Sequence, residues 1–382
     1  MMQISNISRA IGPTLSRQLY MLAKQYDDVI DFTLGDPDIQ TPTGICEAAT
    51  EASMQGKTRY SPNGGIPELR EAIATQASIE TGLKYNLNNV AITIGATEAI
   101  YLALNAILNE GDEVIILAPY WVQYKNIVEL HKAKPVIISS FTKDFEPDID
   151  AIREAVTEHT KIIVYNSPNN PSGILYRDEI LKGIAQVAQE NHLYVFADEV
   201  YKSLVYGNRY PSITKYCPSE NLLIFNSFSK QFAMTGWRVG YVIGNEDLID
   251  VIIKLQQNIA VCAPTISQYA ALEAITHIQD YSVPVAQEFA RRREIILGEI
   301  KSCPKVSFTA PEGTFYVFVN IGSTGMDSRR FCMSLLEKEH VAMIPGIAFG
   351  DKFDDHVRLA FTLEQNSIIS GAQRLKHFVN TL

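Results

Sequence analysis

Residues 222–244 read LLIFNSFSKQFAMTGWRVGYVIG, two apolar runs joined by a polar turn. The runs 222–226 and 239–244 lack the alternation of a half-exposed strand and are typical of strands buried on both faces of a sheet. The turn between them places two hydroxyls, an amine and a guanidinium within a dozen residues: Ser227, Ser229, Lys230 and Arg238. A lone serine or lysine here would indicate only a solvated loop. Four such groups at a strand end indicate a functional site.

The same rhythm continues on the N-terminal side of this segment. Seven short apolar runs are predicted as strands: 90–95, 113–118, 135–139, 161–166, 193–197, 222–226 and 239–244. Helical patterns, with apolar residues three or four apart, lie over 97–108, 148–156 and 178–191. This alternation predicts an α/β fold with a doubly wound, mainly parallel sheet, whose ligands bind beyond the carboxyl ends of the strands.

The regular alternation of predicted strands and helices ends near residue 285. Beyond it we predict a long charged helix over 287–301, strands over 316–321 and 356–361, and helices over 328–340 and from Glu364. This order predicts a second, smaller α+β domain. We therefore expect an N-terminal arm with the start of the small domain (1–44), a large domain (45–285) and a small C-terminal domain (286–382). Within the arm, apolar residues at helical spacing after Pro13 predict a short amphipathic helix, up to Tyr26, that packs on the body or on a partner subunit.

The composition disfavours several classes of protein. The 382 residues carry 33 Lys+Arg against 43 Asp+Glu, a formal net charge of −10, which disfavours nucleic acid or an anionic membrane as the main partner. No apolar run approaches the roughly 18 residues of a membrane span. The five cysteines form no C-x-x-C pair and predict buried thiols in a reducing compartment. The histidines and acidic residues show no metal-binding spacing. We expect a soluble, cytoplasmic enzyme without a metal.

Two catalytic chemistries compete for the polar turn. The spacing Ser227-x-x-Lys230 matches a serine–lysine acyl hydrolase, with Ser227 as nucleophile and Lys230 as its base. That pattern also requires S-D-N and K-T-G elements, and the nearest approach to the second is Lys57-Thr58-Arg59. In the other interpretation Lys230 forms a Schiff base, while the neighbouring hydroxyls and guanidinium hold a phosphate.

The predicted strand 193–197 runs into Asp198-Glu199-Val200-Tyr201. A purely structural role for Asp198 would be a helix N-cap, where aspartate is favoured. Its functional interpretation is a partner for a protonated ring nitrogen, with Tyr201 reaching an oxygen on the same ring. Pyridoxal phosphate offers both groups, and a buried carboxylate keeps its pyridinium protonated.

Two further strand ends carry uncharged groups. The turn after 161–166 holds Asn166, Asn169 and Asn170, each of which can set an amide beside the ring oxygen; Asn170 is the preferred candidate. The segment Gly95-Ala96-Thr97 opens a predicted helix, where small residues let backbone N–H groups approach an anion. No G-x-G-x-x-G or G-x-x-x-x-G-K-[ST] motif occurs, which removes the commoner nucleotide sites.

One arginine, Arg358, lies inside a predicted apolar strand of the small domain. Arginines are seldom buried without a partner, so a carboxylate is expected beside it. That carboxylate is either an internal Asp or Glu, or the α-carboxylate of a substrate.

Taken together, these segments resemble the fold-type I, pyridoxal-phosphate-dependent class I/II aminotransferases, and the aspartate aminotransferase-like branch in particular. The resemblance runs from LGDPD (34–38) through RYSPNGG (59–65) to VRL (357–359), and residues 227–240 are its most specific part. It implies that the large domain binds pyridoxal 5'-phosphate. It also implies a homodimer with shared sites, amino acid and 2-oxo acid substrates, and a place in amino acid metabolism and biosynthesis.

The resemblance assigns roles residue by residue. Lys230 would carry the Schiff base and then act as the base, Asp198 would hold the pyridinium, and Tyr201 and Asn170 would flank the phenolic oxygen. The other implied cofactor contacts are Gly95, Ala96, Thr97, Trp121, Ser227, Ser229, Arg238 and, from the neighbouring subunit, Tyr60. The implied substrate contacts are Gly35, Trp121, Asn170 and Arg358, of which Arg358 would clamp the α-carboxylate.

The implied reaction is a ping-pong transfer of the amino group of an L-amino acid to a 2-oxo acid. Several aspartate-using relatives have a lysine where this chain has Thr97, so the donor is left open between acidic, neutral and aromatic amino acids. A pyridoxal-phosphate-dependent lyase, acting by C–S cleavage or β-elimination, is the alternative function on the same fold. A transcription regulator would need a basic helix-turn-helix, and none precedes residue 40.

Overall fold

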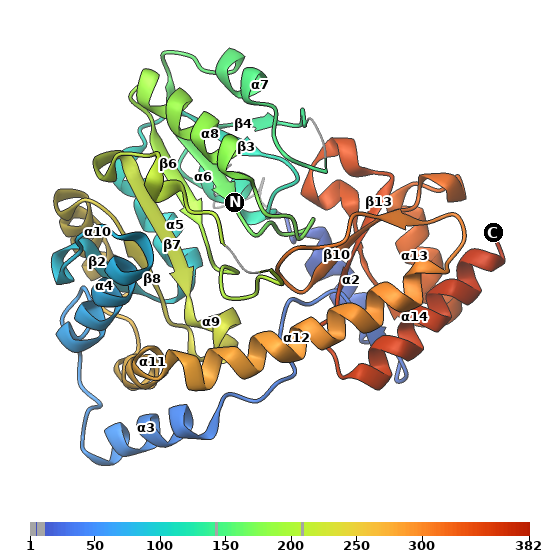
Figure 1. The fold of residues 1–382 in the computed structure, drawn as a ribbon, viewed down its shortest axis with the longest axis horizontal. Coiled ribbons are helices and arrows are strands. Elements are labelled where there is room, and N and C mark those ends of the chain that lie inside the picture. Colours follow the sequence, from blue (N-terminus) through green and yellow to red (C-terminus); the bar gives the residue numbers. More distant parts are fainter. Residues whose placement is uncertain (1–4, 6–11, 142–143, 208–209) are drawn as a thin grey trace, which may run out of the picture.

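The computed structural model describes residues 5, 12–141, 144–207 and 210–382 (Figure 1). Its helices are α2 (Leu15–Ala23), α3 (Thr43–Met54), α4 (Pro67–Thr81), α5 (Gly95–Ile107), α6 (Gln123–Leu130), α7 (Ile149–Glu154), α8 (Asp178–Glu190), α9 (Phe228–Gln231), α10 (Glu246–Ile259), α11 (Thr265–Thr276), α12 (Ile278–Lys301), α13 (Ser328–Glu339) and α14 (Gln365–Asn380). Its strands are β1 (Ile30–Asp31), β2 (Val90–Thr93), β3 (Glu113–Leu117), β4 (Lys134–Ile138), β5 (Thr160–Asn166), β6 (Tyr194–Asp198), β7 (Leu222–Ser227), β8 (Gly240–Ile243), β9 (Ser307–Phe308), β10 (Tyr316–Asn320), β11 (Val341–Ala342), β12 (Ile344–Pro345) and β13 (His356–Ala360).

The larger body is built on a seven-stranded sheet in the order β2-β8-β7-β6-β5-β3-β4. Strands β4, β3, β5, β6 and β7 are parallel, and β8 runs antiparallel to both of its neighbours. Every residue of β2, β3, β7 and β8 is buried, because helices such as α5 and α8 pack against the sheet. The seven predicted strands and the α/β class are confirmed.

The smaller body has a four-stranded antiparallel sheet in the order β12-β13-β10-β9. Helix α14 packs against α12 and α13, and a second hydrophobic core forms around aromatic residues such as Phe289, Phe315 and Phe378. We propose that the two cores are the large and small domains expected over 45–285 and 286–382. In the predicted N-terminal arm, α2 buries Leu19 and Ala23; residues 1–4 and 6–11 of the arm lie outside the described residues.

Helix α12 is longer than the helix predicted over 287–301, since it begins at Ile278 and contains Pro284. A proline removes one backbone hydrogen bond from a helix, but apolar packing holds the turns on either side of it. Ile278 packs against the first core, while Val285 and Phe289 belong to the second. The helix therefore runs from one body to the other, as Figure 1 shows above α3.

The topology brings the polar strand ends together. Strands β5, β6 and β7 are parallel neighbours and end at Asn166, Asp198 and Ser227, so these residues lie along one edge of the sheet. The N-terminus of α5 follows β2 and packs against β7 and β8. A ligand bound at this edge would meet residues from four separate parts of the sequence.

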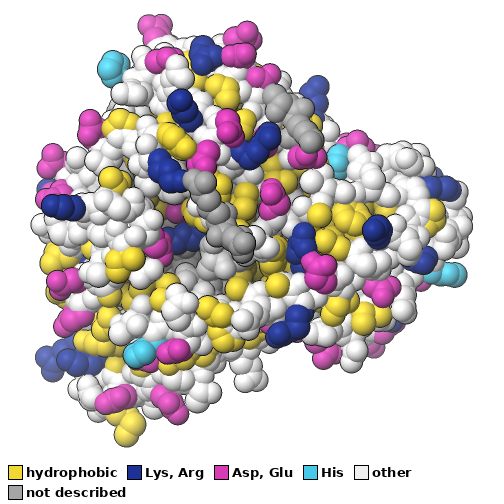
Figure 2. Space-filling model, viewed as in Figure 1, with side chains coloured by type: hydrophobic (Ala, Val, Ile, Leu, Met, Phe, Trp, Pro, Cys, Tyr) yellow, Lys and Arg dark blue, Asp and Glu magenta, His cyan; other side chains and the backbone are white. Residues whose placement is uncertain are grey.

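The described surface carries charges of both signs. On the face shown in Figure 2, Lys and Arg side chains are interspersed with Asp and Glu. Within the described ranges, no helix combines the length and apolar character that crossing a bilayer requires.

Candidate active site

A cavity of about 300 Å³ opens at the carboxyl edge of the large sheet and is lined by both bodies. Twelve of the predicted site residues line it: Gly35, Ala96, Thr97, Trp121, Asn170, Asp198, Tyr201, Ser227, Ser229, Lys230, Arg238 and Arg358. Gly95 lies just behind the cavity wall, beside the Arg238 guanidinium. Tyr60 is outside the cavity and 82% exposed in the single chain.

Lys230 lies in the short helix α9, whose N-cap is Ser227. Its ammonium donates to the Gly35 carbonyl at 2.5 Å. Burial lowers the pKa of Lys230 to about 8, with the nearby Asp36 carboxylate opposing the shift. A lysine with this pKa has a substantial neutral fraction near pH 8, so its amine can act as a nucleophile and as a base.

Asp198 lies at the end of β6 and is 5% exposed. Burial raises the pKa of Asp198 to about 6, although hydrogen bonds from the Tyr124 hydroxyl and the Val200 N–H oppose the shift. A cationic group in the cavity would stabilise the charge of this carboxylate. The structure thus fits a protonated ring nitrogen at Asp198.

The sequence analysis missed Tyr124. Its hydroxyl donates to Asp198 Oδ2, and its ring packs edge-on against Trp121 with 5.2 Å between the ring centroids. Both aromatic residues come after β3, Trp121 just before the N-cap of α6 and Tyr124 in its first turn. The repeated aromatic residues of this segment were the available signal, but nothing in the sequence linked them to Asp198.

The N-terminus of α5 and the polar turn form a cup for an anion. Ser227 Oγ donates to Ser229 Oγ at 2.8 Å, and Arg238, which is exposed, lines the cavity together with Ala96 and Thr97. Gly95 has φ +75°, and a Cβ at this position would stand 2.6 Å from the Arg238 guanidinium. Glycine is needed here because it allows both the backbone angle and the close approach. Hydroxyls, free helix N–H groups and a guanidinium suit a phosphate.

Arg358 enters the cavity from β13 and is 6% exposed. Its guanidinium donates to Asn170 Oδ1 at 3.1 Å and to the Thr33 carbonyl, while its Nε has no hydrogen-bond partner. It lies 4.3 Å from the centroid of the Tyr316 ring. Among the described residues, none provides a carboxylate within 4.0 Å of it. A substrate carboxylate is therefore the partner that this buried cation fits.

The three asparagines after β5 play different parts. Asn170 faces the cavity, where its side-chain oxygen accepts from Arg358. Asn166 joins two loops, because its amide donates to the Asp198 carbonyl at 2.9 Å and its oxygen accepts from the Asn170 N–H at 2.7 Å. Asn169 donates to the Pro119 carbonyl, away from the cavity lining.

Tyr201 is buried, and its hydroxyl lies 3.1 Å from that of Tyr316, a second residue that the sequence analysis missed. Tyr316 lies in β10, whose register with β13 places it opposite Ala360, two positions from Arg358. This register joins residues of the small body to Tyr201 of the large one. Only the folded chain reveals it.

The geometry disfavours the serine–lysine hydrolase. Ser227 Oγ bonds Ser229 Oγ and the Val239 carbonyl, whereas the Lys230 amine bonds Gly35. A base must lie within hydrogen-bond reach of the hydroxyl that it activates. The Lys230 amine bonds the Gly35 carbonyl instead of the Ser227 hydroxyl, so it is not placed to act as the base of a hydrolase.

Comparison with known proteins agrees with this geometry. The family description "Aminotransferase class I and II" matches residues 27–375. An "Aspartate aminotransferase" of Pyrococcus horikoshii is 38% identical over 365 residues, covering 94% of this chain and 93% of the relative. A "Probable aspartate/prephenate aminotransferase" of Aquifex aeolicus is 36% identical over 384 residues, covering 98% of this chain and 97% of the relative. The solved structure of aspartate aminotransferase from Thermus thermophilus with maleate superimposes with a TM-score of 0.94 at 35% identity, covering 100% of both chains.

Proposed function

We propose how the cavity works on the premise that the chain belongs to the class I and II aminotransferase family and is a pyridoxal-phosphate-dependent transaminase. When bound, pyridoxal phosphate draws electrons from the substrate's α-carbon and so makes the proton on that carbon acidic. The observation that carries the proposal is the joint presence, in one cavity, of Lys230, Asp198 and Arg358, each in the chemical setting that this reaction needs.

Different residues of the cavity would bind different parts of the cofactor. Asp198 would hold the ring nitrogen, with Tyr124 donating to the carboxylate. The start of α5 and the polar turn would hold the phosphate. Tyr201 and Asn170 would bind the ring oxygen, and Trp121 would pack on the ring.

Lys230 and Arg358 act on the substrate. Arg358 binds the α-carboxylate through its fork of donors and so orients the α-carbon. The Lys230 amine would hold the cofactor in the resting enzyme and, once the substrate amine has released it, would serve as the base that moves the proton of the substrate's α-carbon. The donor leaves as a 2-oxo acid, and a second 2-oxo acid leaves as an amino acid, so the kinetics are ping-pong.

The donor is any L-amino acid whose α-carboxylate Arg358 can hold, and its side chain decides the preference. Relatives named as aspartate and aspartate/prephenate aminotransferases support aspartate as the first donor to test. The part of the cavity wall formed by Thr14, Gln123 and Phe349 is uncharged and supports an aromatic donor such as phenylalanine as the second.

The working unit is a homodimer in which Tyr60 completes the cavity of the partner. Tyr60 and Met54 are 82% and 85% exposed in the single chain, a high exposure for large hydrophobic side chains, which a partner subunit would cover. Mixing inactive Lys230→Ala and Tyr60→Ala chains should restore about a quarter of wild-type activity, because half the dimers are mixed and each has one intact site. No recovery in mixed dimers would contradict shared sites. We place the enzyme in the cytoplasm because its five cysteines form no disulfide with one another. A place in amino acid biosynthesis rests on the family resemblance alone.

Titration of the yellow holoenzyme with a single amino acid and no oxo acid tests the function. A transaminase loses its visible absorbance and releases one equivalent of 2-oxo acid per site. Release of ammonia or of a sulfur product, without 2-oxo acid equivalent to bound cofactor, would indicate a lyase instead.

A further inference from the structure

Residues 33–38, here called the strap, follow β1, and Gly35 of the strap lines the cavity. Three strap residues bond the smaller body: the Thr33 carbonyl accepts from Arg358, the Leu34 carbonyl accepts from Thr362 Oγ1 at 2.9 Å, and the Asp38 N–H donates to the Thr362 carbonyl at 3.2 Å.

The middle of the strap bonds the larger body. The Gly35 carbonyl accepts from Lys230 Nζ at 2.5 Å, and Asp36 Oδ1 accepts from Thr235 Oγ1 at 2.7 Å. The strap thus joins Lys230 and Thr235 of the larger body to Arg358 and Thr362 of the smaller body.

The strap is also tightly packed at Gly35. A Cβ at this position would overlap the hydroxyl of Tyr316 and come within 3.1 Å of Phe315. The strap backbone therefore lies directly on Tyr316, whose ring contacts Arg358, and on Phe315, whose ring contacts Lys230. Because the packing at Gly35 leaves no free space, the strap cannot shift here without moving these rings.

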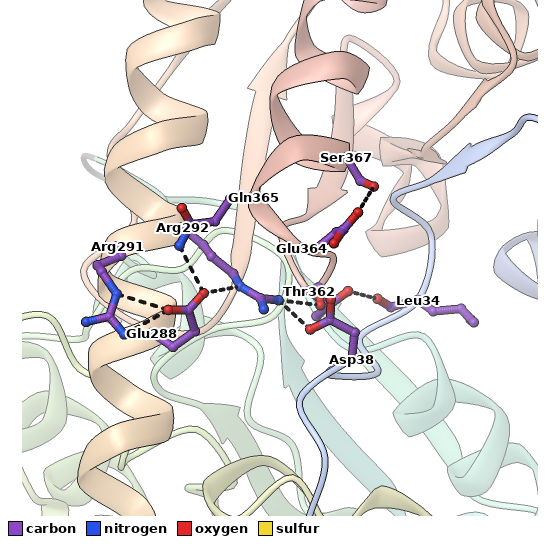
Figure 3. A network of polar contacts seen from close by, with 9 residues as sticks. All are labelled: Leu34, Asp38, Glu288, Arg291, Arg292, Thr362, Glu364, Gln365 and Ser367. Atoms are coloured by element: carbon purple, nitrogen blue, oxygen red, sulfur yellow. Dashed lines mark hydrogen bonds and ion pairs between the residues drawn. The ribbon is translucent and has the colours of Figure 1, made fainter.

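One buried cation anchors the C-terminal end of the strap. Arg292, in the middle of α12, is 6% exposed, and its NH1 donates to Asp38 Oδ1 at 2.6 Å and to the Thr362 carbonyl at 2.7 Å. Its Nε donates to Glu288 Oε1 at 2.9 Å, one turn back in the same helix. Figure 3 shows the guanidinium pointing from α12 to the strap and to the segment after β13.

Burying an arginine removes it from water at a substantial free-energy cost, which hydrogen bonds of good geometry must offset. A hydrophobic residue would fill this site at lower cost. Arg292 joins groups on α12, on the strap and after β13. Among the described residues, the other hydrogen bonds between these groups are those of Thr362 to Leu34 and Asp38 and that of Gln365 to Glu288. The hydrogen bonds of Arg292 therefore fix the positions of α12, the strap and the segment after β13 relative to one another.

We propose that Arg292 is a positioning residue of the active site. Arg292 fixes the strap by its hydrogen bonds to Asp38 and to the Thr362 carbonyl. The strap in turn positions two active-site residues: its Thr33 carbonyl holds Arg358, and its Gly35 carbonyl holds Lys230. The proposal rests on the function proposed above, since it assigns Arg358 to the α-carboxylate.

The proposal predicts where the kinetic effect falls. When the strap is released, Arg358 loses the Thr33 carbonyl that orients it, so donor binding weakens more than the chemical step. Because the loss of the hydrogen bonds to Arg292 is only partly transmitted through the strap, we expect KM to rise about 10-fold for every donor and kcat to fall less than about 3-fold.

Arg292→Met tests this directly, and Arg291→Gln is the matched control. Arg291 is the next residue of α12 and bonds the same Glu288, but its side chain is 62% exposed and has no bond to the strap. Steady-state kinetics of the holoenzyme is combined with hydrogen exchange of the Asp38 amide, whose bond to Thr362 reports on the strap. We expect Arg292→Met to raise both KM and the exchange rate, and Arg291→Gln to leave both within about twofold.

Asp38→Asn provides a second variant if Arg292→Met folds poorly. It leaves Arg292 bonded to Glu288 and weakens only the link to the strap. If Arg292 acts through Asp38, the double variant should raise KM no further than the larger single effect. Additive effects, an unchanged KM, or an equal effect of Arg291→Gln would overturn the proposal. Wild-type enzyme that releases no 2-oxo acid would instead refute the proposed function, while the exchange of the Asp38 amide would still report on the strap.

Discussion

Replacing Asp198 with asparagine should make the cofactor-free protein more stable at neutral pH while abolishing efficient turnover. Burial raises the pKa of Asp198 from 3.8 to about 6. The folded protein therefore binds this proton more tightly than the unfolded chain, and the ionised carboxylate is unfavourable in the folded state. A shift of about two pKa units corresponds to about 3 kcal/mol.

The sign of this effect depends on pH. Below about pH 4 the carboxyl is protonated in both states, so the wild type and Asp198→Asn should be equally stable. As the pH rises from about 4 to 6 the wild type loses stability relative to the variant, and above 6 the difference stays constant. Asparagine keeps an oxygen that can accept from Tyr124, so this bond is common to both proteins.

Urea unfolding of the two apoproteins at pH 4 to 8 measures the difference in free energy of unfolding. Asp250→Asn, at a side chain 62% exposed, is the control and should show no comparable gain above pH 6. With pyridoxal phosphate bound, the order should reverse, because only the wild type can pair with a protonated ring nitrogen. An apoprotein gain that is absent at pH 7, or that persists at pH 4, would refute the reasoning.

Three further substitutions and conditions test the site. Arg358→Gln should raise KM for every donor by about 100-fold, because the α-carboxylate is common to all; an effect on one donor alone in a donor panel would contradict the clamp. Tyr124→Phe should weaken pyridoxal phosphate binding by about 10-fold in an absorbance titration, since it removes a charge-assisted bond to Asp198, whereas Tyr120→Phe in the same segment should not. The rate at which apoprotein takes up pyridoxal phosphate should rise with pH and level off above about 8, because the Lys230 amine must be neutral; a rate independent of pH between 6 and 9 in stopped-flow absorbance would contradict this pKa.

The strands of the large sheet were predictable because they are buried on both faces. Runs such as 222–226 contain almost only apolar residues, and the turns between them carry the polar groups, so both strands and strand ends are visible in the sequence. Helix α11 was not predicted. It packs against both α3 and α4, so its apolar residues form no single stripe. The early start of α12 was hidden by Pro284, which normally marks a helix boundary.

Some residues of the candidate site could likewise be predicted from the sequence, and others could not. Residues at strand ends, such as Asp198 and Lys230, could be predicted because the parallel topology collects them at one edge. Tyr124, Tyr316 and Arg292 could not, because their contacts join residues 74, 115 and 254 positions apart through tertiary packing alone. Their roles depend on which side chain faces which body, and this is set by register and helix orientation rather than by local pattern.

Borohydride reduction of the holoenzyme, followed by peptide mapping, tests the central claim most directly. Reduction makes the bond between pyridoxal phosphate and its lysine permanent, so mass spectrometry identifies the residue. The account predicts modification of Lys230 alone, since burial lowers its pKa to about 8 at the cavity wall. Lys202, whose side chain is 19% exposed, lies outside the cavity and is paired with Glu80 at 2.6 Å. Label on Lys202, or on any lysine other than Lys230, would contradict the account.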